Sequence, residues 1–68
     1  MVKTPKPLDE VDWAEAAEHL VGMFPGASLG EIVARAEAAA VTLNQMGMMR
    51  EAESMRRAAE HVRRHRMN

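Results

Sequence analysis

Apolar residues recur every three or four positions in three stretches of the chain, which is the spacing of one face of an α-helix. The stretches span about residues 12–24, 28–46 and 48–65. The apolar face of the first stretch consists of Trp13, Ala16, Ala17, Leu20, Met23 and Phe24. The pattern predicts an all-α fold in which a short N-terminal helix precedes a longer helix–turn–helix hairpin.

Helix-capping residues begin the first two stretches. Asp12 precedes Glu15 by three residues, and Ser28 precedes Glu31 by the same distance. This is the spacing of a capping box, in which the first side chain accepts a hydrogen bond from the backbone N–H three residues later. We therefore expect the first helix to begin at Asp12, or alternatively at Asp9, and the second to begin just after Ser28.

Prolines mark the segments outside the helices. Pro25 disfavours helix at the residue before it, and Pro25–Gly26 is typical of a turn. Pro5 and Pro7 lack backbone donors, so residues 1–8 are expected to form an extended, flexible tail. A single helical domain is expected over residues 9–68.

Gly47 separates the second stretch from the third, and glycine commonly ends helices in the left-handed conformation. The apolar face also changes phase there. Before Gly47 it consists of Leu29, Ile32, Val33, Ala36, Ala39, Ala40, Leu43 and Met46, and after it of Met48, Ala52, Met55, Ala59 and Val62. This change favours a break near Gly47. The alternative is one helix over residues 28–65 with a second apolar seam at alternating spacings of four and three.

Residues 36–62 resemble one tetratricopeptide-repeat hairpin. The residues that carry the resemblance are Ala39, Ala40 and Leu43 before the turn, Gly47 in it, and Ala52 and Ala59 after it. The resemblance implies a helix–turn–helix hairpin that binds protein. A single hairpin of this kind cannot bury both of its faces alone.

The chain has little bulky apolar material for its 68 residues. Twelve of its apolar residues are Ala and seven are Met, whereas only six Val, four Leu, Ile32, Phe24 and Trp13 are well suited to fix a core. Alanine contributes little when buried, and small domains are marginally stable. We therefore expect a homodimer whose helices complete a bundle, or an equivalent assembly with a protein partner.

Charge is distributed unevenly along the chain, whose net charge is −1. Residues 1–47 have a net charge of −4, and residues 48–68 have a net charge of +3. The candidate electrostatic patch comprises Arg56, Arg57, Arg63, Arg64 and Arg66. Such a patch can bind phosphates, so a small nucleic-acid-binding regulator is the alternative function.

The sequence offers little catalytic or metal-binding chemistry. His61 and His65 lie four residues apart, close enough on a helix to share a metal ion, but the neighbouring arginines oppose a cation. The hydroxyl groups are explained by caps, helix positions and the tail, and no glycine-rich phosphate loop is present. We expect no enzyme activity, metal or cofactor.

The expected location is cytoplasmic. The N-terminal residues lack the apolar run of a signal peptide, and no apolar run reaches the roughly 18 residues of a membrane span. The absence of Cys is consistent with a reducing compartment. We expect no membrane association.

Methionines and aromatic residues form the candidate partner or dimer surface. Methionine side chains adapt to different partners, and Trp and Phe are common anchors of interfaces. The candidate residues are Trp13, Phe24, Met46, Met48, Met49 and Met55. The expected function is that of a small non-catalytic regulator, an adaptor or inhibitor of the type that phages and plasmids encode, which occupies a surface of a larger protein.

Overall fold

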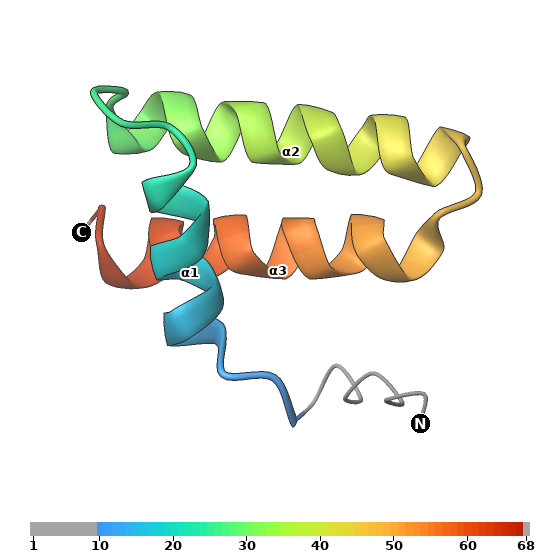
Figure 1. Ribbon diagram of the computed structural model, residues 1–68, viewed down its shortest axis with the longest axis horizontal. Helices are drawn as coiled ribbons and strands as arrows, with labels where there is room; N and C mark the ends of the chain where they lie inside the picture. The colour runs from blue at the N-terminus through green and yellow to red at the C-terminus, as the bar shows by residue number, and fades with distance from the viewer. Residues whose placement is uncertain (1–9, 68) are drawn as a thin grey trace.

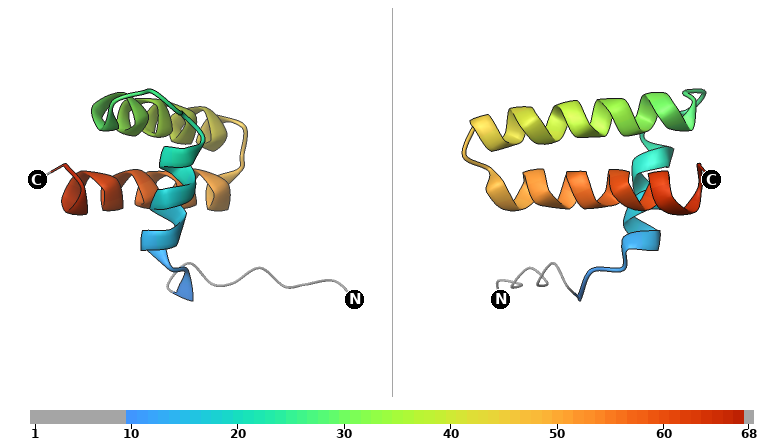
Figure 2. Two further views of the ribbon diagram at one scale, coloured as in Figure 1. Left: turned by 60° about the vertical axis from the view of Figure 1, so that its left-hand side comes forward. Right: turned by 180° about the vertical axis from the view of Figure 1, so that it is seen from behind.

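The computed structural model describes residues 10–67, which form three helices. These are α1 (Trp13–Gly22), α2 (Leu29–Gln45) and α3 (Met49–His65). Helices α2 and α3 run antiparallel as a hairpin, and α1 crosses one side of it near the start of α2 and the end of α3 (Figures 1 and 2). The predicted all-α fold with a helical hairpin is confirmed, while the expected tail at residues 1–8 lies outside the described residues.

Both predicted N-terminal caps are present. The Asp12 carboxylate accepts hydrogen bonds from the backbone N–H groups of Ala14 and Glu15, at 3.1 and 3.2 Å. The Ser28 hydroxyl accepts one from the N–H of Glu31 at 3.2 Å. These bonds satisfy donors that the first helical turn cannot pair within the helix.

A tight turn brings the chain from α1 to α2. The N–H of Ala27 donates to the carbonyl of Phe24 at 3.2 Å, and Gly26 between them has a φ of 86°. Proline at the second position and a left-handed glycine at the third are the requirements of a type II turn. Helix α1 ends at Gly22, two residues before its predicted end.

The chain reverses at Gly47, just after the end of α2. Residues 28–65 therefore form two helices in a hairpin, and the single long helix is excluded. Gly47 has a φ of 83°, and its N–H donates to the carbonyl of Asn44 at 3.1 Å. The N–H of Met48 donates to the carbonyl of Leu43 at 2.9 Å. These two bonds form a Schellman motif, which pairs the last carbonyls of the helix as the chain reverses.

The same change to alanine is expected to have opposite effects at two glycines. Gly47→Ala should destabilise the fold by about 1 kcal/mol, because a side chain is strained at its positive φ. Gly22→Ala should stabilise it by about 0.5–1 kcal/mol, because Gly22 is helical with open space around it. Urea unfolding of both variants measures the two changes in unfolding free energy. Changes of the same sign would contradict the different roles given to the two glycines.

The core lies where α1 crosses the hairpin. Its buried residues are Ala17, Leu20, Ile32, Val33, Ala36, Ala58, Ala59 and Val62, drawn from all three helices. Ile32 and Val62 are its largest fully buried side chains. Because Ala36 and Ala59 are small, α2 and α3 can approach each other closely at this end.

The hairpin extends beyond this core as an arm, here defined as residues 40–52. Its buried residues are Ala40 and Ala52, which bury little apolar area. Met46 and Met48 belong both to the predicted apolar faces and to the candidate partner surface, and they are 66% and 39% exposed. They lie in the turn, outside the two helices, so the helical spacing no longer directs them inward.

Met23 is a third departure from the predicted core face. It follows the end of α1 as the C-cap residue and is 62% exposed. The remaining members of the α1 stripe are buried or partly buried. The exposed methionines therefore lie at helix ends.

Candidate functional site

One candidate surface is the side of the hairpin opposite α1, here called the hairpin face (Figure 2, right). Each helix of the hairpin contributes four residues at the spacing of a single helical face. They line a shallow groove of about 390 Å³ and are Glu37, Ala40, Val41, Asn44, Met49, Ala52, Glu53 and Arg56. Val41 and Met49 are 58% and 63% exposed, on either side of the buried Ala40 and Ala52.

The hairpin face carries charges of both signs. Nη2 of Arg63 lies 2.8 Å from both carboxylate oxygens of Glu37, which links α3 to α2. Arg56 donates through Nε and Nη2 to the two oxygens of Glu53, at 3.0 and 2.7 Å. Acidic and basic groups thus alternate along this side of the hairpin.

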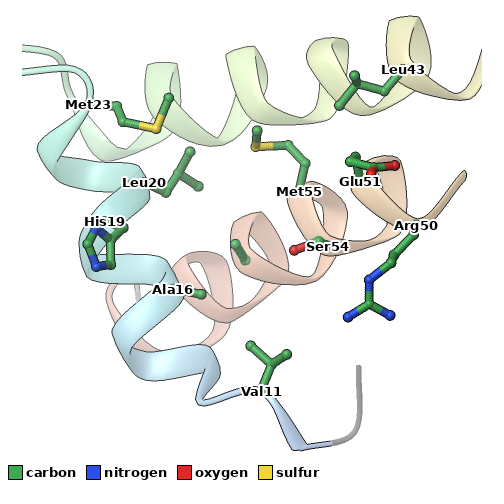
Figure 3. Close-up of a pocket in the computed structure, with 11 residues that line it drawn as sticks. Val11, Ala16, His19, Leu20, Met23, Leu43, Arg50, Glu51, Ser54 and Met55 are labelled. Atoms are coloured by element: carbon green, nitrogen blue, oxygen red, sulfur yellow. The ribbon is translucent and has the colours of Figure 1, made fainter. Parts of the chain in front are cut away.

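The second candidate surface is the α1 groove, a hollow of about 510 Å³ between α1 and the arm (Figure 3). Helix α1 lines one wall, α3 another, and Leu43 of α2 closes one end. Its lining residues are mostly apolar: Val11, Ala16, His19, Leu20, Met23, Leu43, Arg50, Glu51, Ser54, Met55 and Ala58.

Carboxylates border the α1 groove along the outer surface of α1. Glu15 and Glu18 are exposed, and Glu15 lies 4.0 Å from the imidazole of His19. Both carboxylates line a shallow depression next to the groove. His19 and Met23 line the depression and the groove alike. The acidic edge, here defined as residues 10–24, contains no Lys or Arg, whereas the α3 wall of the groove carries one charge of each sign, on Arg50 and Glu51.

The structure distributes the six predicted partner residues over different places. Trp13 and Phe24 pack partly buried against the core, beneath the guanidinium groups of Arg57 and Arg35 at 5.8 and 5.9 Å from the ring centres. The methionines divide as follows: Met46 and Met48 are in the turn, Met49 is on the hairpin face, and Met55 is in the α1 groove.

Four of the five arginines in the predicted electrostatic patch form ion pairs. Besides the pairs of Arg56 and Arg63, Arg57 lies 2.7 Å from Glu53 and Arg64 lies 2.9 Å from Glu60. Arg66 is exposed just after the end of α3. The neighbouring carboxylates reduce the positive potential that the cluster presents to phosphates.

The ion pairs of Glu53 predict an acid-sensitive contribution to stability. Hydrogen bonds from Arg56 and then Arg57 lower the pKa of the Glu53 carboxyl from 4.5 to about 2. Because the pKa is lower in the folded state, this contribution is complete above about pH 4.5 and disappears as the pH falls toward 2. Between pH 4.5 and about 2, the free energy of unfolding should fall less steeply with pH for Glu53→Gln than for the wild type. Parallel curves would contradict the prediction.

Other chemistry is limited in the described part of the chain. The rings of His61 and His65 stack at 4.4 Å between centres. Within residues 10–67, no group of three or more His, Cys, Asp or Glu residues is placed to hold a metal ion. No helix among these residues has the length and apolar character needed to cross a membrane.

Sequence reasoning missed Val41, Ala40 and Ala52 as parts of one candidate surface. Their signal was the spacing of positions 37, 40, 41 and 44 and of 49, 52, 53 and 56, which the turn at Gly47 brings to the same side. No family model, curated protein or solved structure matches the chain. The proposed function therefore rests on the two candidate surfaces.

Proposed function

We propose that this chain is a small non-catalytic protein-binding regulator, an adaptor or inhibitor, which forms a homodimer through the hairpin face. The observation that carries the proposal is the pair of exposed side chains of Val41 and Met49 flanking a floor of alanines. Exposed apolar side chains grouped beside a flat, small-residue floor are typical of helix–helix interfaces.

A second copy of the chain suits the hairpin face because the face has charges of both signs. In a twofold dimer each copy presents the same surface, so an interface must be complementary to itself. Glu37, Glu53 and Arg56 supply both acidic and basic partners for such a match. Each helix of the hairpin has 17 residues, roughly 25 Å, so two hairpins make a four-helix bundle of ordinary length.

In the proposed dimer, the α1 grooves stay open on the outer sides. The regulatory role follows from this arrangement, because each groove is free to bind a surface of a larger protein. The alternative function, nucleic-acid binding through the arginine cluster, predicts DNA affinity that falls steeply with salt. The four ion-paired arginines favour the protein-binding proposal over this alternative.

The first test is the solution mass by light scattering over a concentration series. A mass near twice 7.6 kDa is expected, and a mass of 7.6 kDa at every concentration would contradict the dimer. The second test places a photoreactive amino acid at Met23 in the source cells. It should cross-link another protein, whereas the same group at Ala38, which is exposed and lines neither surface, should not.

A further inference from the structure

We infer that the α1 groove binds a basic amphipathic helix of another protein. The inference rests on the proposed protein-binding function and adds the chemistry of the partner. It is carried by two properties that occur together, namely a mostly apolar hollow, in which Arg50 is balanced by Glu51, and the acidic edge at residues 10–24.

The shape and lining of the α1 groove suit an incoming helix. Positions 16, 19 and 20 of α1, with Met23 just after its end, form one wall, and Met55 points into the hollow from α3 (Figure 3). An amphipathic helix presents its apolar residues at the same spacing, so its ridge can lie along this wall. Met23 and Met55 adapt to side chains of different shapes because methionine has three rotatable bonds.

The charges beside the groove select the polar face of the partner. Glu15 and Glu18 are exposed and line one depression with His19 and Met23, and Glu10 and Asp12 extend the acidic edge along the same segment. Lysine or arginine residues that flank the apolar stripe of a bound helix would meet these carboxylates. An acidic helix would be repelled by them.

A second copy of the chain is a poor occupant of this groove. Its own α1 carries the same exposed carboxylates, and four arginines of its α3 already pair with Glu37, Glu53 and Glu60. The hairpin face, with both signs of charge, is the surface that suits self-association. The two surfaces therefore select different partners.

Three synthetic helical peptides test the inference. They share an apolar face of leucines and differ only in the polar face, which carries Lys, Gln or Glu. Fluorescence anisotropy gives the dissociation constant of each peptide with the protein, at low salt and at about 0.15 M salt. Circular dichroism of each protein variant verifies that its helices are intact.

Two matched pairs of variants locate the binding. Met23→Ser removes an apolar side chain from the groove, and Met46→Ser makes the same change in the turn, outside the groove. Glu18→Gln removes one carboxylate from the acidic edge, and Glu31→Gln removes one exposed carboxylate from α2.

The Lys peptide is expected to bind most tightly and the Glu peptide most weakly. Met23→Ser should weaken the affinity for the Lys peptide about five- to tenfold, because it removes apolar contact. Glu18→Gln should weaken this affinity about two- to fivefold at low salt, with a smaller effect at about 0.15 M salt. Met46→Ser and Glu31→Gln should leave its affinity unchanged.

Other outcomes overturn the inference in distinguishable ways. If all three peptides bind equally and Met23→Ser weakens each, the groove binds helices without selecting basic ones. If the Lys peptide binds every variant equally, its attraction is diffuse and the groove is not its site. If no peptide binds, the inference fails, while the light scattering and the cross-link at Met23 still decide the proposed function separately.

Discussion

Ile32→Ala is expected to lower the free energy of unfolding by about 2–5 kcal/mol. Ile32 is 1% exposed and is one of the two largest fully buried side chains. Removal of its branched side chain loses apolar burial and leaves a cavity between packed helices. A chain of 68 residues has a total stability of roughly 3–10 kcal/mol, so the variant should lose a large part of its stability and unfold at a much lower urea concentration.

Circular dichroism during urea unfolding measures this loss. Met23→Ala is a suitable control, because it also removes a large apolar side chain but at a position that is 62% exposed. The control should change the unfolding free energy by less than about 0.5 kcal/mol. Similar losses for the two variants would mean that Ile32 is not the centre of the core.

Val41→Asp combined with Met49→Asp is expected to convert the proposed dimer to a monomer. In a twofold interface each substitution occurs twice, so four unpaired carboxylates would face one another in a region that excludes water. Light scattering should give 7.6 kDa at concentrations where the wild type has twice that mass. The helical content of the monomer should fall chiefly in the arm, where Ala40 and Ala52 alone are buried among the described residues.

Ala38→Asp combined with Met46→Asp is the matched control for this experiment. It adds the same number of charges to exposed positions of α2 and the turn that do not line the hairpin face. The control should remain dimeric. If the first pair of substitutions also remained dimeric, the hairpin face would not be the interface between copies.

Most of the fold follows from local signals in the sequence. The caps at Asp12 and Ser28 and the left-handed glycine at Gly47 each act within a few residues, so their effects can be read from neighbours in the chain. The salt bridges Glu53–Arg57 and Glu60–Arg64 are equally local, because residues four apart are adjacent on a helix.

The surfaces depend on contacts that are distant in sequence and were harder to predict. The pair Glu37–Arg63 joins residues 26 positions apart, and its formation requires the register of α2 against α3. Met23 and Met46 continue an apolar pattern, yet each is exposed because its helix has already ended. Periodicity identifies a helical face, but it does not show which part of that face another helix covers.

The concentration of bulky residues at one end of the hairpin has a consequence for hydrogen exchange. Backbone amides near Ile32 and Val62 are expected to open only when the whole domain unfolds, whereas amides near Ala40 and Ala52 are expected to open through local separation of the arm. A ligand that covers the arm favours its closed form and slows exchange there by mass action. In the proposed dimer, occupancy of the hairpin face would therefore order the arm while leaving the end of the hairpin that contains the core unchanged.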